Sequence, residues 1–184
     1  MIRTLSNRLV NSIAKNEYDE EQMEKMEYTL NIIIFESLKL LGSIVVFSIS
    51  GYFIECCIAT ATTLVLKPFI GGYHEKTQIK CFIATLLLTA GEIVLSKQCP
   101  LSFSGSLILI VICLLSIYNE APVINPLMPL TRPELIQRNR KIALINTSVV
   151  GSIAIIFYNI NTYSSLMVWT VTILTLLMFN KKNF

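Results

Sequence analysis

Six apolar runs separated by short polar breaks dominate the pattern along this chain. A membrane-spanning helix needs roughly 20 apolar residues, with a range of about 17–25, and each run falls in or close to that range. The second run is the weakest, because Thr60, Thr62 and Thr63 dilute it and Pro68 comes near its end. The pattern predicts an all-α, polytopic membrane protein with about six transmembrane helices. The runs cover residues 30–50, 52–70, 79–97, 102–119, 142–159 and 163–180.

The breaks between the runs carry residues that are typical of turns. Ser50-Gly51, Gly71-Gly72 and Cys99-Pro100 mark three of them. The connections between the first and second, third and fourth, and fifth and sixth runs are very short, whereas the other two are longer and polar. The three short connections predict three helical hairpins.

Residues 1–28 are more polar than the rest and are expected to form a segment of their own. Ile2, Leu5, Leu9 and Ile13 have a helical, one-sided spacing. This spacing favours an amphipathic helix on the membrane surface, and a solvated tail is the alternative. No signal peptide is expected, because no apolar stretch with a small-residue cleavage site follows the first basic residues. We divide the chain into this amphipathic cytoplasmic segment and a six-span transmembrane domain, residues 29–184.

Composition supports the membrane class and argues against several others. Hydrophobic residues make up 53% of the chain and charged ones only 15%, against about 25% charged in soluble domains. No basic cluster is interleaved with aromatic residues, so no nucleic-acid partner is expected. No cysteine pair has CxxC spacing and the number of cysteines is odd, so we expect no disulfide scaffold and no metal site. No cofactor is expected either. Four cysteines in or beside apolar runs are expected to be small core residues: Cys56, Cys57, Cys99 and Cys113.

The basic residues are distributed asymmetrically around the apolar runs. With a cytoplasmic N-terminus, 13 of the 15 lysines and arginines fall on the cytoplasmic side, while Lys97 falls outside and Lys39 lies within the first run. Cytoplasmic loops of membrane proteins carry such an excess of positive charge. The asymmetry predicts an even number of spans with both termini cytoplasmic. The polar segment of residues 71–81 is then also cytoplasmic, where thiols remain reduced.

Several charged residues lie within the apolar runs. Glu36 and Lys39 are one helical turn apart and can neutralise each other. A purely structural pair and a contact to a polar substrate are both open. Glu55 and Glu92 lie near the outer ends of their predicted spans, so we expect their side chains to reach the membrane interface.

His74 and Cys81 are the candidate catalytic pair, because a thiol and an imidazole are the minimum for cysteine nucleophilic catalysis. His74 is the only histidine in the chain. Residues seven apart on one straight helix are about 10.5 Å apart along its axis, which is too far for a direct hydrogen bond. We therefore expect His74 in a loop before the helix of Cys81. Gly71-Gly72 permits the sharp turn this needs, and Thr77 is a plausible N-cap that puts Cys81 in the first full turn.

The surroundings of Cys81 favour a thiolate. A helix N-terminus and nearby positive charges both stabilise negative charge on sulfur, and Lys67, Lys76 and Lys80 are close in the sequence. The alternatives stay open at this point. A cysteine in a membrane helix can serve packing alone, and a histidine at an interface can be a tolerated polar residue.

The connection between the fourth and fifth runs is rich in proline. It reads Tyr-Asn-Glu-Ala-Pro-Val-Ile-Asn-Pro-Leu-Met-Pro-Leu-Thr-Arg-Pro over residues 118–133. Prolines stiffen the backbone and forbid a regular helix here. The segment is either a connector that holds two helices apart or a rigid wall facing Cys81 that receives an extended peptide. The candidate substrate-loop residues are Pro122, Pro126 and Pro129.

Two motifs together resemble a known family. Lys-Pro-Phe-Ile-Gly-Gly-Tyr-His-x6-Cys, followed by Tyr-x2-Ala-Pro-Val-x2-Pro-x2-Pro, is similar to the accessory gene regulator protein B (AgrB) family of bacterial quorum sensing. The resemblance covers nearly the whole chain. It implies a cysteine endopeptidase of the bacterial cell membrane that cuts the C-terminal tail from a short amphipathic precursor, the AgrD-type peptide. The enzyme passes through an acyl-thioester, which an internal cysteine or serine of the precursor attacks to close a thiolactone or lactone ring.

The resemblance also implies roles for individual residues. Cys81 is the nucleophile and His74 the base. Lys67 stands where the family usually has arginine, so the charge is kept but a bidentate fork is not. Gln78 stands where some relatives have serine. Lys67, Gln78 or a backbone N–H near Thr77 can stabilise an oxyanion.

Other positions depart from the family or bear on its assembly. Ile124 and Met128 replace an acid and a lysine that relatives often carry, while Gly72 matches a family glycine. The resemblance favours a homodimer in membrane lipid, and Gly42, Ser43 and Gly151 offer close-packing surfaces.

Two other functions remain open from the sequence. A small transporter or channel-like protein would line a polar path with Glu36, Lys39 and the threonines of the second run. A passive membrane scaffold would need neither His74 nor Cys81.

Overall fold

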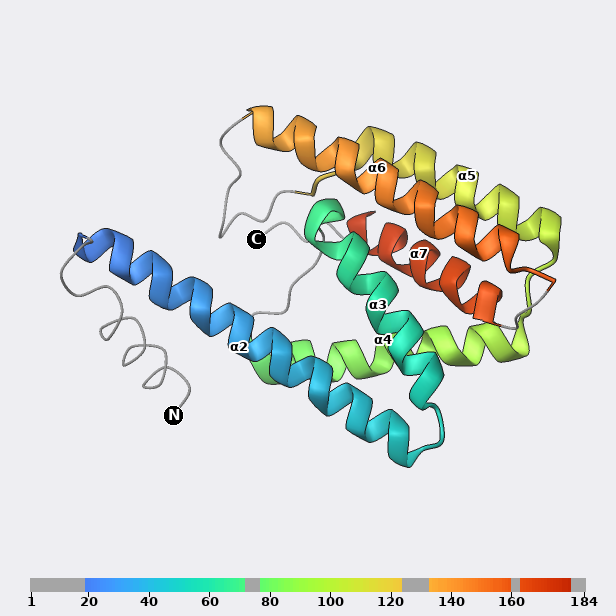
Figure 1. Ribbon diagram of the computed structural model, residues 1–184, viewed down its shortest axis with the longest axis horizontal. Coiled ribbons are helices and arrows are strands. Elements are labelled where there is room, and N and C mark those ends of the chain that lie inside the picture. The colour runs from blue at the N-terminus through green and yellow to red at the C-terminus, as the bar shows by residue number, and fades with distance from the viewer. Residues whose placement is uncertain (1–18, 72–76, 124–132, 160–162, 180–184) are drawn as a thin grey trace. The chain divides into compact units, whose positions relative to one another are not determined.

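The computed structural model describes residues 19–71, 77–123, 133–159 and 163–179, and this part of the chain contains six helices (Figure 1). The predicted all-α class is confirmed. The helices are α2 (Glu20–Ile49), α3 (Phe53–Ile70), α4 (Gln78–Gln98), α5 (Phe103–Glu120), α6 (Pro133–Ile156) and α7 (Tyr163–Phe179).

Four of these helices begin and end close to the predicted limits. The Thr-rich run forms all of α3, although Pro68 lies in its last turn. A proline lacks the N–H that would bind the carbonyl four residues earlier. One residue beyond that carbonyl, the Asn146 side chain of α6 donates to the Val65 carbonyl at 2.8 Å, so α6 supports α3 beside its proline.

Two helices begin earlier than the apolar runs predicted. α2 starts at Glu20 and continues across the boundary expected at residue 28. α6 starts at Pro133, nine residues before the run at 142. Pro133 was expected to keep the chain out of a helix, but the first helical position needs no N–H donor and suits proline. Glu134 comes next in the first turn, where a negative charge is favoured.

Several helices suit a membrane. Residues 29–49, α3, α4 and α5 are long and apolar enough to cross one, judged by length and composition. α7 is apolar but has 17 residues, and the first turns of α6 are charged. Large apolar side chains are exposed on several helices, among them Leu41, Leu64, Leu87, Ile108 and Ile145. The protein is a membrane protein, and the count of six spans stays a prediction.

The chain divides into two compact units, Met1–Val46 and Phe47–Phe184. In the first, the Lys39 ammonium forms an ion pair with the Glu36 carboxylate one turn away on α2. This confirms the predicted pairing. The second unit contains α3 to α7.

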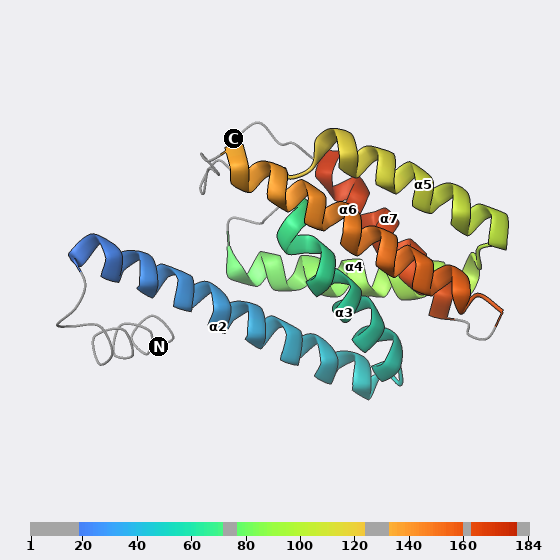
Figure 2. The ribbon, with the colours of Figure 1, turned by 45° about the horizontal axis from the view of Figure 1, so that its top comes forward.

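The second unit is a bundle built around its last helix. α7 contacts α3, α4, α5 and α6 (Figures 1 and 2), and nine of its 17 residues are buried. Leu66 and Ile70 of α3 and Cys113 and Ile117 of α5 are buried in the same apolar core as Met178 of α7.

Close packing between α5 and α6 depends on a glycine. A Cβ at Gly151 would lie 2.9 Å from a methyl carbon of Ile110. Gly151, which the sequence offered as a surface for helix association, is thus buried within one chain.

The bundle has two ends, and three side chains bind the backbone at one of them. There the Ser165 hydroxyl accepts from the Leu101 N–H at 3.2 Å, while Tyr158 donates to the Leu101 carbonyl at 3.1 Å. The Trp169 indole donates to the Cys99 carbonyl at 3.1 Å. We call this the Cys99 end. The opposite end, where α3 and α5 finish and α6 begins, is the Gly71 end.

Candidate functional site

Cys81 lies in the first turn of α4. Thr77 is the N-cap, with an extended backbone and a side-chain oxygen that accepts from the Lys80 N–H at 3.4 Å. The Cys81 N–H donates to the Thr77 carbonyl at 3.0 Å. The predicted cap and the predicted place of Cys81 are both confirmed. The first N–H groups of a helix have no partner within it, so this turn presents donors close to the thiol.

The side chains of this turn reach the surface. Cys81 is half-buried and Gln78 is exposed. Residues three apart on a helix are neighbours on its surface, so the Gln78 amide lies on the Cys81 side of α4. The Thr85 hydroxyl donates to the Cys81 carbonyl at 2.9 Å and fixes the following turn. Gln78 and Cys81 therefore share the first turn of α4, and the role of Gln78 stays a prediction.

Several predicted site residues lie outside the described part of the chain. His74 and Gly72 fall in residues 72–76, and Pro126 and Pro129 fall in residues 124–132. The structure describes the backbone on both sides of each of these segments.

Gly71 ends α3 with a conformation that favours glycine. Its φ is +73° and ψ is −154°, a region that is strained for residues with a side chain. A Cβ at this position would lie 2.4 Å from the Val123 carbonyl oxygen. The predicted turn at Gly71 is thus confirmed. Glycine is needed here for a second reason as well, because another backbone segment approaches closely.

That segment is the start of the proline-rich connection. The Val123 N–H donates to the Ile70 carbonyl at 2.9 Å, and Gly71 and Val123 form an isolated parallel β-bridge. Pro122 is buried beside them. The sequence could place the two polar segments only on the same side of the membrane. The structure shows that they touch, immediately before residues 72–76, which include His74.

Arg140 of α6 completes this contact, and no sequence pattern indicated its role. Its Nε donates to the Ala121 carbonyl at 2.7 Å, just after α5 ends. From the sequence, Arg140 was one basic residue among several in the predicted loop before the fifth run. We call the set Ile70, Gly71, Ala121, Val123 and Arg140 the junction.

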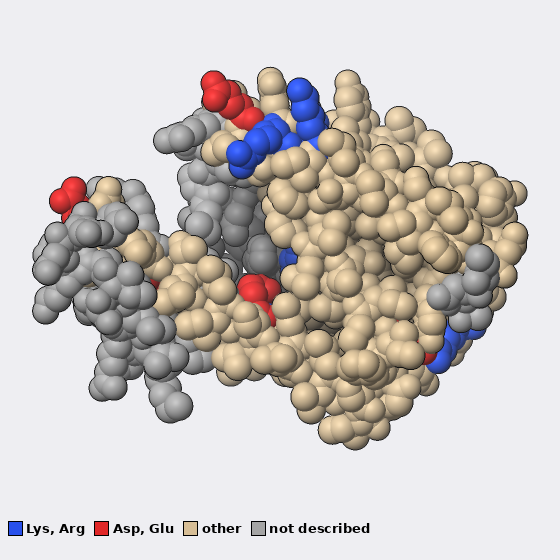
Figure 3. Space-filling view, in the orientation of Figure 1, with Lys and Arg blue, Asp and Glu red and all other residues tan. Residues whose placement is uncertain are grey.

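Lys67 is half-buried in the last turn of α3, and its carbonyl accepts from the Gly71 N–H at 3.0 Å. A cation in this turn favours the helix dipole. Figure 3 shows further basic side chains gathered over the first half of α6, where Arg138, Arg140 and Lys141 lie. Basic side chains therefore gather at the Gly71 end, with acidic Glu134 beside them in the first turn of α6.

The two acidic residues predicted at the outer interface differ from each other. Glu55 of α3 pairs with Lys97 of α4 at 3.0 Å. Glu92 was expected to reach the interface, and this prediction was wrong. It is 3% exposed, and the Thr170 hydroxyl of α7 donates to it at 3.3 Å. The helix turns position 92 toward α7, which hydropathy along the sequence does not reveal.

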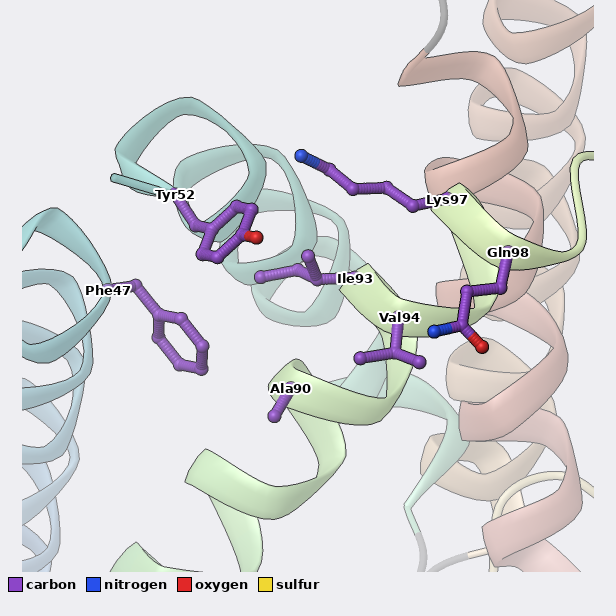
Figure 4. Close-up of a pocket in the computed structure, with 7 residues that line it drawn as sticks. All are labelled: Phe47, Tyr52, Ala90, Ile93, Val94, Lys97 and Gln98. Carbon is purple, nitrogen blue, oxygen red and sulfur yellow. The ribbon is translucent and has the colours of Figure 1, made fainter. Parts of the chain in front are cut away.

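A cavity of about 190 Å³ lies at the Cys99 end, away from Cys81. Figure 4 shows its lining, which includes Phe47, Tyr52, Ile93 and Lys97. The Lys97 ammonium lies 4.3 Å from the centre of the Tyr52 ring and already pairs with Glu55. Cys81 is about 27 Å from Cys99 along α4, at 1.5 Å per residue, so this cavity does not serve the thiol.

Known proteins with similar sequences settle the family. A family model described as accessory gene regulator B matches residues 6–179. The chain belongs to the accessory gene regulator B family. An AgrB-like protein of Clostridium perfringens (strain 13 / Type A) is 41% identical over 163 residues, which are 89% of this chain and 87% of that protein. No solved structure matches.

Membership confirms the resemblance inferred from the two motifs. AgrB proteins are membrane proteins related to quorum sensing, and the apolar helices agree with this setting. The family also implies association with an AgrD-type precursor peptide in the membrane.

Proposed function

We propose that this AgrB protein is a cysteine endopeptidase that removes the C-terminal tail of an AgrD-type precursor and promotes its cyclisation. The observation that carries the proposal is the position of Cys81. It lies in the first turn of a capped helix, seven residues after the only histidine in the chain. The junction supports the proposal, since it brings the proline-rich connection against the residue that precedes the His74 segment.

The first half of the proposed reaction forms an acyl-enzyme. His74 takes the proton of the Cys81 thiol, and the sulfur attacks the scissile carbonyl carbon. Backbone N–H groups in the first turn of α4, with Gln78 or Lys67, stabilise the oxyanion. The C–N bond then breaks, the tail amine takes the proton from His74, and a thioester to Cys81 remains.

The second half closes the ring. A cysteine thiol or serine hydroxyl within the precursor gives its proton to His74 and attacks the thioester carbonyl. The bond to Cys81 breaks, the product leaves as a thiolactone or lactone, and the enzyme thiol takes back the proton. A thioester exchange is close to balanced in energy, so the acyl group can pass to another thiol. Water must be kept away, because hydrolysis of the thioester would waste it.

The proposal includes a cytoplasmic site and cytoplasmic termini. It rests on the distribution of basic residues in the sequence. The junction is consistent with it, since Lys67 of α3 and Arg140 of α6 lie at the same end of the bundle. A homodimer is proposed from the family resemblance alone.

A transporter remains the competing function, although its polar path gains no support. Glu36 and Lys39 pair with each other, and Thr60 bonds within its own helix to Cys56 at 3.8 Å. Buried Glu92 is the one observation that favours transport, because ionisable groups inside a membrane often mark pathways.

The test is cleavage of a co-expressed AgrD-type precursor in membranes. We expect Cys81→Ser and His74→Ala each to abolish cleavage while the protein still inserts. Cys99→Ser is the matched control, because Cys99 is an exposed cysteine at the other end of the same helix, and it should cleave normally. Full cleavage by Cys81→Ser would remove the nucleophile assignment. Precursor flux that is insensitive to thiol alkylation would favour the transporter.

A further inference from the structure

Arg140 differs from the other basic residues at the start of α6. Its Nε bonds the Ala121 carbonyl at 2.7 Å, and it is partly buried. Arg138 and Lys141 are exposed on the same helix. A charged donor on a backbone carbonyl is among the stronger protein hydrogen bonds. The carbonyl at a helix C-terminus also carries partial negative charge. Both the charged hydrogen bond and the helix dipole therefore stabilise the Arg140 contact.

Two bonds link Arg140 to the segment that carries the histidine. Ala121 is fixed by Arg140, and two residues later the Val123 N–H donates to the Ile70 carbonyl. Ile70 is 1% exposed, and the next residue is Gly71, with no space for a Cβ. Residues 72–76, which include His74, begin directly after Gly71. The position of Val123 therefore sets the position of Gly71, the last described residue before that segment.

We propose that Arg140 is a positioning residue that holds the junction closed and so fixes the point from which the His74 segment starts. Arg140 acts through Ala121 and Val123 and does not itself take part in the chemistry. Its effect on turnover rests on the proposed peptidase function. Its effect on the junction does not, so the two can be tested separately.

The first test measures the junction without using activity. In Arg140→Gln, amide hydrogen exchange in the peptide of residues 118–123 should be about tenfold or more faster than in the wild type, because the Val123 bond opens more often. Peptides from α7 should exchange as before. Arg138→Gln removes the same charge from the same helix and should leave exchange at Val123 unchanged. Unchanged exchange in Arg140→Gln would overturn the proposal.

The second test separates positioning from binding in precursor cleavage. Arg140→Gln should lower kcat about tenfold and change KM less than twofold, because the precursor still binds while His74 is misplaced. Arg140→Lys keeps a charged donor within reach of the Ala121 carbonyl and should restore most of kcat and slow exchange. An equal loss in Arg138→Gln would show that charge alone matters and would overturn the proposal. If exchange rises in Arg140→Gln but cleavage does not depend on Cys81, the junction role stands and the peptidase function fails.

Discussion

The two ends of the α3–α7 bundle are held by different kinds of contact. At the Cys99 end, the side chains of Ser165, Tyr158 and Trp169 bind the backbone of one short connection. At the Gly71 end, two backbone segments bind each other, and Arg140 is the side chain that supports them. At the Cys99 end, the side chains fix the connection between α4 and α5 by binding its backbone N–H and carbonyl groups. The arrangement at the Gly71 end brings two chain segments together through their own backbone groups and one side chain from a third helix.

Gly71→Ala should cause the largest loss of stability, because it changes the residue at the backbone contact with Val123. The new Cβ would meet the Val123 oxygen at 2.4 Å, and the backbone has φ +73°, so clash and strain together should cost about 3 kcal/mol. Gly51→Ala is the control, with φ +80° but nothing within 4 Å of the added Cβ, and should cost about 1 kcal/mol. Thermal unfolding in detergent measures both. Equal losses would mean that the approach of Val123 does not matter.

Ser165→Ala should cause the second largest loss of stability, and it tests the hydrogen bonds at the Cys99 end. It leaves the Leu101 N–H without its partner, which should cost about 2 kcal/mol. The neighbouring Ser164 is also buried, and its hydroxyl has no partner among the described residues. Ser164→Ala should be neutral or slightly stabilising. The same thermal measurement checks the pair, and a larger loss from Ser164→Ala would contradict the assignment.

Thr77→Ala and Ser102→Ala compare two helix caps of the same kind. Thr77 caps α4 beside Cys81, and Ser102 caps α5 at the Cys99 end. Each should cost about 1 kcal/mol of stability. Only Thr77→Ala should also reduce precursor cleavage, because the first turn of α4 holds the thiol. A similar loss of cleavage in both variants would mean that the assay reports stability rather than the site.

Glu55→Gln should have the smallest effect. It removes the pair with Lys97, whose side chain is 49% exposed, and such pairs contribute about 0–1 kcal/mol. Unfolding in low and high salt measures it, and the difference from the wild type should shrink as salt rises. A loss above about 2 kcal/mol would show that the Cys99 end depends on charge as well as on hydrogen bonds.

Features that depend on local chemistry could be predicted from the sequence. The apolar runs located most helix limits, and turn and cap preferences identified Gly71 and Thr77. The lone histidine with a cysteine seven residues later, and then the family motifs, indicated Cys81 as the candidate nucleophile, and that role stays a prediction. Prediction failed where tertiary packing decides the outcome. Glu92 faces α7 because of the rotation of α4 about its axis. No pattern of residue types along the chain predicts that rotation.

Arg140 and the start of α6 are two further features that sequence patterns could not predict, because tertiary contacts decide them. The polar first turns of α6 fall outside any apolar run, so their helical state depends on Pro133 at the start and on contacts across the bundle. Arg140 could be counted as a positive charge, but its partner is a backbone carbonyl 19 residues away. A backbone carbonyl is present at every residue, so no pattern of residue types identifies the one that is used.

The central place of α7 has a consequence for how the bundle is made. α3, α4, α5 and α6 all contact α7, yet each of them precedes it in the chain. During synthesis these four helices are made before the helix around which they pack. The Glu92 carboxyl group must bind water or a temporary partner until α7 arrives. Assembly of the bundle is therefore coupled to the synthesis of α7, when Thr170 becomes available to Glu92.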